Sequence, residues 1–297
     1  MVKTDLLSTR QVAELLGVGE ATVKRWADAG EIDCFRTPGG HRKFRLRDVT
    51  LFVQKRHYTV GDAFPAQLPP GFDEVTDAVG AVEKIALSGN ASALVAQIAA
   101  LRLRGQELAA IFDEAVAPAL VRIGDDWQQC KLSVAEEHVA AQAVIEAISR
   151  SQPLAESPGG ASRASRGTAV VAAAAGEQHD IAARMAACLL RARGFEVLAP
   201  LAATPSTDLA DMVVRSRANL VAVASTAPAD ATALQEQIEM AARAARSSGG
   251  RLVVGGKGMS QLKLPPEVLF LRSMSDLDAQ MGSLGRRRGA AHAHAAD

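Results

Sequence analysis

The chain has 297 residues, and its 33 Lys and Arg balance its 33 Asp and Glu, so the formal net charge is zero. Because one domain usually holds roughly 100 to 150 residues, this length predicts two or three domains, and 48% hydrophobic residues argue against a disordered chain. No apolar stretch reaches the ~18 to 20 residues of a membrane span, and the first residues lack the apolar middle of a signal peptide. We therefore expect a cytoplasmic protein with no membrane partner. The three cysteines are widely spaced, which predicts ordinary buried or half-buried thiols and neither disulfides nor a zinc site.

The first segment is basic, with eleven Lys and Arg against seven Asp and Glu in residues 1–58. Ser8 followed three residues later by Gln11 predicts a helix N-terminus, and glycines at 17–19 separate this helix from a second one over 20–29. We expect the second helix to pack through Ala21, Val23 and Trp26. Two short helices with such a turn predict a helix-turn-helix, whose second helix enters the DNA major groove.

Two short basic strands follow, on either side of a Pro-Gly-Gly turn at 38–40 and ending near Arg47. They predict a wing whose cations reach phosphates. The stretch VAELLGVGEATVKRWADAGEI with the later TPGGHRKFR resembles the winged helix-turn-helix domains of the MerR family, which implies binding to double-stranded operator DNA. A protein-binding helical module is the alternative, but it needs fewer cations. The residues expected to contact phosphates or bases are Thr22, Lys24, Arg25, His41, Arg42, Lys43 and Arg45.

Residues 73–150 show only helical periodicity, which predicts a four-helix bundle. The expected helices lie at about 73–89, 91–105, 106–127 and 133–150. Stretches rich in Pro, Gly or Ser flank this part and predict linkers at 58–72 and 151–167. Ser133 and Glu136 make a capping box at the last helix, so Glu137 and His138 fall in its first turns.

From 168 to 286, continuous apolar strands alternate with helices. This pattern predicts a doubly wound parallel α/β domain of the flavodoxin-like kind, covered by helices on both faces. The expected strands are TAVVAAAAG, FEVLAPL, NLVAVAST, RLVVGG and VLFLRS. The rest of the chain, GRRRGAAHAHAAD, has no period and is expected to be a solvated tail.

The segment GEQHDIA places His179 just past the end of the first of these strands, where ligands bind in open parallel sheets. Glu177 could hold one imidazole nitrogen and leave the other as a metal ligand. A surface or helix-capping role of His179 is the alternative. Two further pairs of small residues end the third and fourth strands, and they predict a slot at this edge: Ser225 with Thr226, and Gly255 with Gly256.

This series resembles the cobalamin-binding fold, in which an acidic residue, a histidine, a serine at a later strand end and a glycine pair recur. The resemblance implies that His179 is the lower cobalt ligand and Glu177 its partner. It also implies that the residues lining the cavity for the nucleotide tail are Ser225, Thr226, Gly255 and Gly256. The chain has Glu177 where the pattern has Asp, and Ala182 where the pattern has Gly.

Trp127 is followed at ten and eleven residues by Glu137 and His138. Core packing and an exposed polar turn would explain these residues singly. Within a bundle between a winged helix and a cobalamin-like domain, they resemble the CarH/LitR type of light-responsive MerR-family repressors. The resemblance implies that Trp127 packs over adenosylcobalamin and that the other two enclose its adenosyl group. Gln128 stands where that family has a histidine.

The expected function is therefore an adenosylcobalamin-dependent repressor that assembles as a dimer or tetramer on operator DNA in the dark and is released by light. No catalytic residue or enzyme activity is expected, because the sequence has no GxxxxGK[ST], GxSxG or HExxH motif. Two alternatives stay open: a MerR-like regulator with a degenerate cobalamin site, and a corrinoid methyl-carrier protein.

Overall fold

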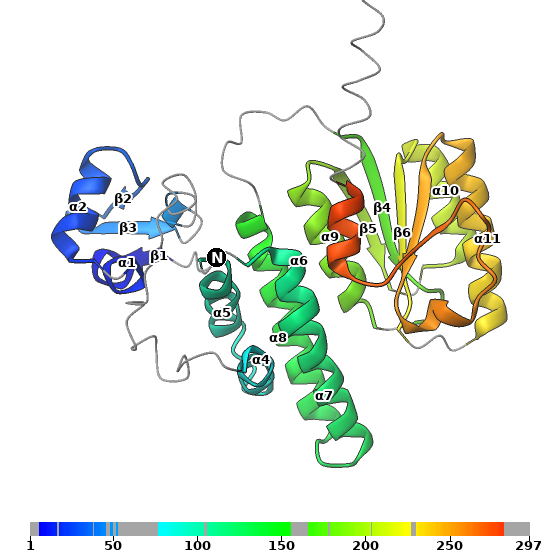
Figure 1. Cartoon of the computed structure of the whole chain (residues 1–297), viewed down its shortest axis with the longest axis horizontal. Coiled ribbons are helices and arrows are strands. Elements are labelled where there is room, and N and C mark those ends of the chain that lie inside the picture. The colour runs from blue at the N-terminus through cyan, green and yellow to red at the C-terminus, as the bar shows by residue number, and fades with distance from the viewer. Residues whose placement is uncertain are drawn as a thin grey trace, which may run out of the picture. The chain divides into compact units, whose positions relative to one another are not determined.

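The computed structural model describes residues 6–281, except for 17, 38, 46–47, 50–51, 53–76, 104–105, 156–165, 178, 203 and 227–229. The chain divides into two compact units, Met1–Gly160 and Ala161–Asp297, and Figure 1 shows their elements. The first unit holds a small β-containing part and a helical part, and the second holds a parallel sheet with helices. Both predicted linkers lie largely outside the described residues, as do Pro38, Arg47 and the tail.

The small part is a winged helix-turn-helix, as predicted. Its elements are β1 (Leu6–Ser8), α1 (Thr9–Leu16), α2 (Glu20–Asp28), β2 (Phe35–Arg36) and β3 (Arg42–Arg45). The capping box is confirmed, because Ser8 N donates to Gln11 Oε1 at 2.8 Å and Gln11 N donates to Ser8 Oγ at 3.2 Å. The core contains Val23, Trp26 and Phe44, and the Trp26 ring lies 4.7 Å from that of Phe52.

Two details of this part differ from the sequence-based expectation. Strand β1 was not predicted; it pairs with β3 in the antiparallel order β1-β3-β2, so its partner lies far along the chain. Ala21 is exposed rather than packed, since α2 buries only Val23 and Trp26. A nine-residue helix over a small core buries a narrow stripe, and Ala21 falls outside it.

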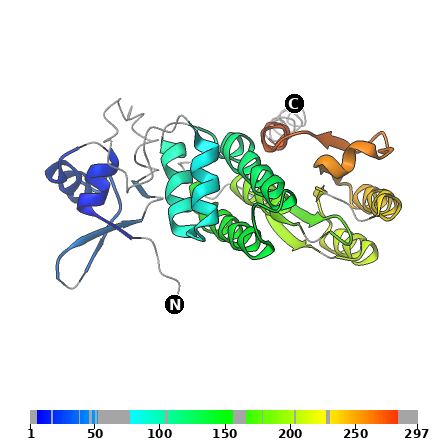
Figure 2. The ribbon, with the colours of Figure 1, turned by 90° about the horizontal axis from the view of Figure 1, so that it is seen from below.

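The helical part contains the four predicted helices, and their axes are seen from another side in Figure 2. They are α4 (Ala78–Leu87), α5 (Ala91–Leu103), the continuous run of α6 (Leu108–Ile111), η1 (Phe112–Val116) and α7 (Ala117–Gln128), and α8 (Val134–Ala155). The second capping box is confirmed at α8, where Ser133 N donates to Glu136 Oε2 at 2.8 Å and Glu136 N to Ser133 Oγ at 3.2 Å. Helix α8 runs five residues past the expected end at 150 and includes Pro153, because a proline in the last turn removes only one hydrogen bond.

The π-helical turn η1 was also not predicted. Within it, Ala117 N donates to Phe112 O, five residues earlier, and Pro118 follows directly. Pro118 has no N–H to donate, so the wider turn lets the helix continue where a regular α-helix would lose a bond. Phe112 and Val116, the first and last residues of this turn, are both buried.

The second unit is the predicted doubly wound α/β domain. Its strands are β4 (Thr168–Ala173), β5 (Glu196–Leu201), β6 (Leu220–Ala224), β7 (Arg251–Gly255) and β8 (Leu269–Leu271), all parallel in the order β5-β4-β6-β7-β8. Between them come α9 (Ile181–Ala192), α10 (Ser206–Ser216), α11 (Ala231–Ser247), the 3₁₀-helix η2 (Lys257–Gln261) and a last helix over 274–281. This strand order is that of flavodoxin-like sheets.

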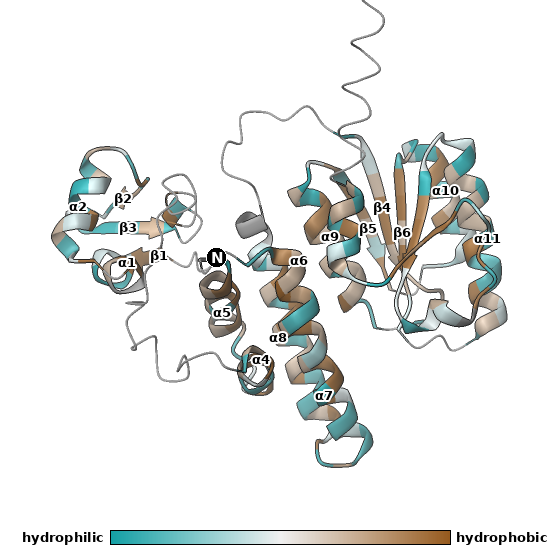
Figure 3. Cartoon of the chain, viewed as in Figure 1, coloured by the Kyte–Doolittle hydropathy of each residue, from teal (hydrophilic) through white to brown (hydrophobic). Residues whose placement is uncertain are grey.

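Helices cover both faces of the sheet, as Figure 1 shows. One buried cluster joins the strands to α10 and α11, and another joins them to α9 and the last helix. The apolar strands β4 and β6 in Figure 3 lie between these layers, which explains their continuous apolar runs. Cys188 is buried, and this raises the pKa of its thiol to about 12; Cys34 is half-buried, while Cys130 is exposed, contrary to expectation. In the described part of the chain no helix is long and apolar enough to cross a membrane.

The α/β domain should be sensitive to a side chain at Gly256. This residue has φ +98°, and an added Cβ would collide with the carbonyl oxygen of Ser225. Gly249 has φ +69° but nothing within 4 Å of an added Cβ. We expect Gly249→Ala to cost about 1 to 2 kcal/mol of unfolding free energy through its backbone conformation alone, and Gly256→Ala about 2 kcal/mol more. Denaturant unfolding of both variants measures the difference, and equal losses would contradict the close approach.

Candidate functional site

The candidate site lies where the connections of the parallel sheet diverge. Strands β4 and β6 are neighbours, and the chain leaves β4 into α9 on one face and β6 into α11 on the other. In open α/β sheets such a switch point opens a crevice at the carboxyl ends of the strands. The predicted residues Glu177 and Ser225 follow these two strands.

A tight turn leads out of β4 toward His179. Glu177 N donates to Ala174 O at 3.0 Å, and Gly176 between them has φ +77°, a conformation that suits glycine. Gln237 of α11 holds the turn from the side, because its Oε1 accepts from Ala175 N at 2.8 Å. Gln237 is fully buried, and its Nε2 has no partner among the described residues.

Glu177 ties the two diverging loops together. Its side chain is 2% exposed, and its carboxylate accepts from Ser225 Oγ at 2.9 Å and from Thr226 N at 2.8 Å. A buried carboxylate is stable only when it is hydrogen-bonded in this way. The expected role of Glu177 as the partner of His179 stays a prediction, since these two bonds join its carboxylate to the loop after β6.

His179 is exposed between two anchored residues, Glu177 and Asp180. Asp180 is buried and accepts from Arg184 Nε at 2.8 Å and Nη2 at 2.7 Å, in a bidentate pair at the start of α9. Ala182, one position into α9 after Ile181, is half-buried. Glu177 before His179 and Asp180 after it are thus held by hydrogen bonds, and the imidazole itself is exposed.

The glycine pair at the end of β7 brings two backbones together. Ser225 N donates to Gly255 O at 3.0 Å, and Gly256 lies against the Ser225 carbonyl. These contacts confirm that the third and fourth strand ends are neighbours. The predicted lining of a nucleotide-tail cavity by Ser225, Thr226 and the two glycines stays a prediction.

The possible metal ligands at this site would fit a metal ion that is already bound in a macrocycle. Among the described residues, no group of three or more His, Cys, Asp or Glu could hold a bare metal ion. A corrin ring would bring most of the ligands of its cobalt with it, so a single protein ligand would be enough to hold the metal. One exposed histidine on a fixed loop, as His179 is, meets this requirement.

In the bundle, the predicted cap residues lie at the junction of α7 and α8. Trp127 is 44% exposed, an unusual position for a large aromatic side chain with no partner in the domain core. Glu137 is half-buried and His138 exposed, with Nε2 of the histidine 3.7 Å from Oε2 of the glutamate. Gln128 ends α7 and is also exposed. An exposed indole beside polar side chains can cover a flat apolar group that carries hydroxyls.

The winged helix presents a basic hollow of about 610 Å³ between α1, α2 and the wing. It is lined by Ser8, Thr9, Arg10, Glu20, Lys24, Thr37, Gly39, Gly40, His41, Arg42 and Lys43. Lys24, Arg25 and His41 are exposed, and Thr22, Lys43 and Arg45 are half-buried. Arg45 lies over the Phe35 ring at 4.4 Å, and Arg42 is ion-paired with Asp28 at 2.6 Å.

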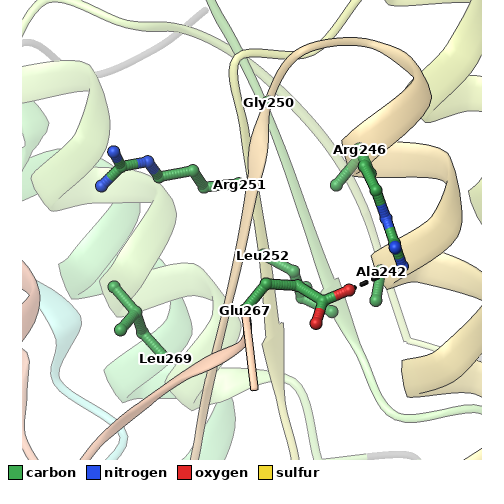
Figure 4. A pocket seen from close by; sticks show the side chains of 8 residues that line it. Ala242, Arg246, Gly250, Arg251, Leu252, Glu267 and Leu269 are labelled. Atoms are coloured by element: carbon green, nitrogen blue, oxygen red, sulfur yellow. Dashed lines mark ion pairs between the residues drawn. The ribbon is translucent and has the colours of Figure 1, made fainter. Parts of the chain in front are cut away.

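A second hollow, of about 460 Å³, lies at the other end of the α/β sheet (Figure 4). It is lined at the amino ends of β7 and β8 by residues that include Arg251 and Leu269, and Arg246 pairs with Glu267 across it at 2.6 Å. Ligands of such sheets bind at the carboxyl ends, so this hollow is not the candidate site.

Four residues that shape these sites escaped the sequence analysis: Gln237, Asp180, Arg184 and Asp28. The spacing of Asp180 and Arg184, four residues apart on a helix, could have revealed their pair. Gln237 and Asp28 act across 62 and 14 residues, where no local pattern exists.

Family models match three parts of the chain. A helix-turn-helix domain matches residues 6–57, and B12 binding domains match residues 74–150 and 167–267. The monomethylamine corrinoid protein of Methanosarcina barkeri has a similar fold, with a TM-score of 0.55 and 11% identity over 70% of this chain and 98% of that one.

Two curated proteins are also similar. The HTH-type transcriptional repressor CarH of Myxococcus xanthus is 27% identical over 250 residues, which are 76% of this chain and 81% of that protein. The transcriptional repressor DcmR of Methylorubrum extorquens is 38% identical over 66 residues, or 22% of this chain and 25% of that protein. The chain is thus a homologue of CarH that joins a helix-turn-helix domain to two B12-binding domains.

Proposed function

We propose that this protein is a transcriptional repressor that binds operator DNA through its winged helix and binds adenosylcobalamin through residues of its bundle and of its α/β domain. Light releases it from DNA, and the dark form is a dimer or tetramer in the cytoplasm. The similarity to two repressors and the two B12-binding domains support a cobalamin-binding regulator rather than an enzyme. The proposals that the cofactor is adenosylcobalamin and that light acts on it are based on Trp127, Glu137 and His138 of the bundle.

The observation that carries the proposal is the exposed His179 on a loop fixed at the switch point. Its imidazole would be the lower ligand of cobalt, and Gln237, Glu177 and Asp180 hold its loop in place. A ligand that is fixed before the cofactor arrives binds with less loss of conformational freedom. In the bundle, Trp127 would cover the adenine, and Glu137 would accept from ribose hydroxyls.

Adenosylcobalamin would supply a cobalt–carbon bond that light breaks. The protein can respond only if its two states bind the cofactor with different affinity before and after that event. Trp127, Glu137 and His138 carry this difference in the proposal, because they enclose the group that is lost. The bundle then no longer favours the DNA-bound assembly.

The main alternative is a regulator that binds DNA with a degenerate cobalamin site. The half-buried Ala182 favours it, because the cobalamin-binding pattern has a glycine there. Uptake of a corrinoid by the purified protein separates the two functions. A corrinoid methyl-carrier is less well supported, since its chemistry gives no use for a winged helix.

The first prediction concerns His179. Wild-type protein mixed with adenosylcobalamin in the dark should show the absorbance of a histidine-bound cobalt, and green light should change the spectrum, the size and the DNA affinity. His179→Ala should change the dark spectrum and weaken binding at least about 10-fold, the loss typical even of an outer partner of a metal ligand. His41→Ala, an exposed histidine of the wing, is the matched control. If light changes none of these properties of the wild type, the light response is contradicted and only the proposal of a cobalamin-binding repressor is left.

The second prediction concerns the cations of the basic hollow. Each phosphate contact adds about 0.9 to the slope of log affinity against log salt. If Lys24 and Lys43 both bind phosphates, Lys24→Gln with Lys43→Gln should lower this slope by about 1.8 and weaken binding to all duplexes. Lys84→Gln, an exposed cation of α4, should leave the slope unchanged. An unchanged slope in the double variant would remove these lysines from the interface.

The third prediction concerns Gln237. Gln237→Met removes the acceptor of Ala175 N and should weaken cobalamin binding about 10-fold in an absorbance titration, because the His179 loop loses one anchor. Gln237→Glu keeps an acceptor oxygen and should restore part of the affinity. Gln235→Met, on the same helix, is the control, since the bonds of Gln235 among the described residues go to Glu239 and to the Lys263 backbone and not to the His179 loop. Equal affinities of the two Met variants would contradict the anchoring role.

A further inference from the structure

A single carboxylate joins the end of the recognition helix to both strands of the wing. Asp28 is the last residue of α2, and its Oδ1 accepts from Arg42 Nη2 at 2.6 Å and from Arg36 Nη2 at 2.9 Å. Its Oδ2 accepts from Arg42 Nη2 at 2.8 Å. Arg36 belongs to β2 and Arg42 to β3, so three elements meet at one side chain.

The two arginines need a counter-charge at this place. Arg36 and Arg42 are directly opposite one another in the β2–β3 ladder. Like charges in such a cross-strand pair repel each other and destabilise the ribbon. Asp28 contacts both guanidinium groups, so it offsets this repulsion and fixes the base of the wing against α2.

The side chain of Arg42 is more buried in its contact than that of Lys24 is. Its side chain is 16% exposed, whereas that of Lys24 is 50% exposed. Its Nε is buried and has no partner in the described parts of the domain. The hydrogen bond from Arg42 also holds the pKa of the Asp28 carboxyl below its usual value, so the pair is ionised at neutral pH.

We infer that Asp28 is a positioning residue of the DNA-binding unit, which sets the angle of the wing to the recognition helix and holds Arg42 in place for that purpose. Arg42 then acts through Asp28, and the phosphate contacts come from the more exposed cations around the hollow. This inference rests on the DNA-binding part of the proposed function and is independent of the cofactor.

The inference and simple electrostatics predict opposite changes in DNA affinity when the charge of Asp28 is removed. An acidic side chain that only lies near DNA repels phosphates, so removing its charge should raise affinity. A carboxylate that positions the wing should lower affinity when it is neutralised. Glu20 offers a matched comparison, because its carboxylate lines the same hollow and lies 3.6 Å from Lys24, on the same helix.

The experiment uses the full-length chain and the duplex that the wild type selects from a random 30-base-pair pool. Asp28→Asn should weaken binding about 10-fold, and Glu20→Gln should leave binding equal or tighter. Arg42→Gln should weaken binding to a similar extent without lowering the salt slope, and the double variant with Asp28→Asn should be no weaker than either single variant. These three results together support the positioning role.

Other results overturn it. Tighter or unchanged binding by Asp28→Asn would make the carboxylate a mere source of repulsion. A salt slope lowered by about 0.9 in Arg42→Gln, or additive losses in the double variant, would make Arg42 a direct phosphate contact. Thermal unfolding should show the Asp28→Asn domain folded, because the side chain at position 28 is 50% exposed and the amide keeps its size and one acceptor oxygen. Loss of the fold would assign the pair a structural role and also reject the inference. A wild type that selects no duplex would instead reject the proposed function.

Discussion

The buried carboxylate of Glu177 is the interaction on which the candidate site depends. It lies at the junction of two loops that leave neighbouring strands for opposite faces of the sheet, and it adds side-chain bonds to the backbone bond from Ala174 N to Ala224 O at 2.9 Å. A carboxylate in this position would destabilise the domain without donors, so its bonds to Ser225 and Thr226 fix both loops at once. The geometry around the imidazole follows from this bond, from the Gln237 contact and from the Asp180–Arg184 pair.

The α/β domain and the winged helix have one feature in common: polar contacts hold the backbone beside an exposed functional side chain. In the α/β domain, buried polar residues fix a loop and leave one imidazole exposed. In the winged helix, the Asp28 carboxylate binds two arginines, while Lys24 and His41 are exposed. In both places an exposed functional side chain lies close to charged residues whose hydrogen bonds are made within the fold.

The sequence predicted the fold class of each part because its signals are local. Capping pairs at Ser8 and Ser133, glycine breaks and continuous apolar strands each lie within a few residues, and the structure confirms them. The residues that hold the sites did not show in the sequence, since a contact such as Gln237 with Ala175 depends on how α11 packs on the sheet. Strand β1 escaped for the same reason: three residues form a strand only when β3 is there to pair with them. The roles assigned to the site residues come from the resemblance to cobalamin-binding proteins, and the structure alone does not assign them.

The π-helical turn before α7 sets the direction in which Trp127 faces. Successive residues of an α-helix are rotated by about 100°, and a π-turn takes up one extra residue, so the same sequence in an unbroken α-helix would present every later side chain about 100° away. Phe112 to Val116 lie eleven or more residues before the indole, yet they determine whether it faces solvent or the bundle core. The direction in which each side chain of α7 points therefore depends on the number of residues in the turn that precedes it. Deleting one residue within Phe112–Val116 would turn the wide turn into a regular one and leave Trp127 on its exposed side, whereas deleting one residue of α7 before Trp127 would rotate the indole by about 100°.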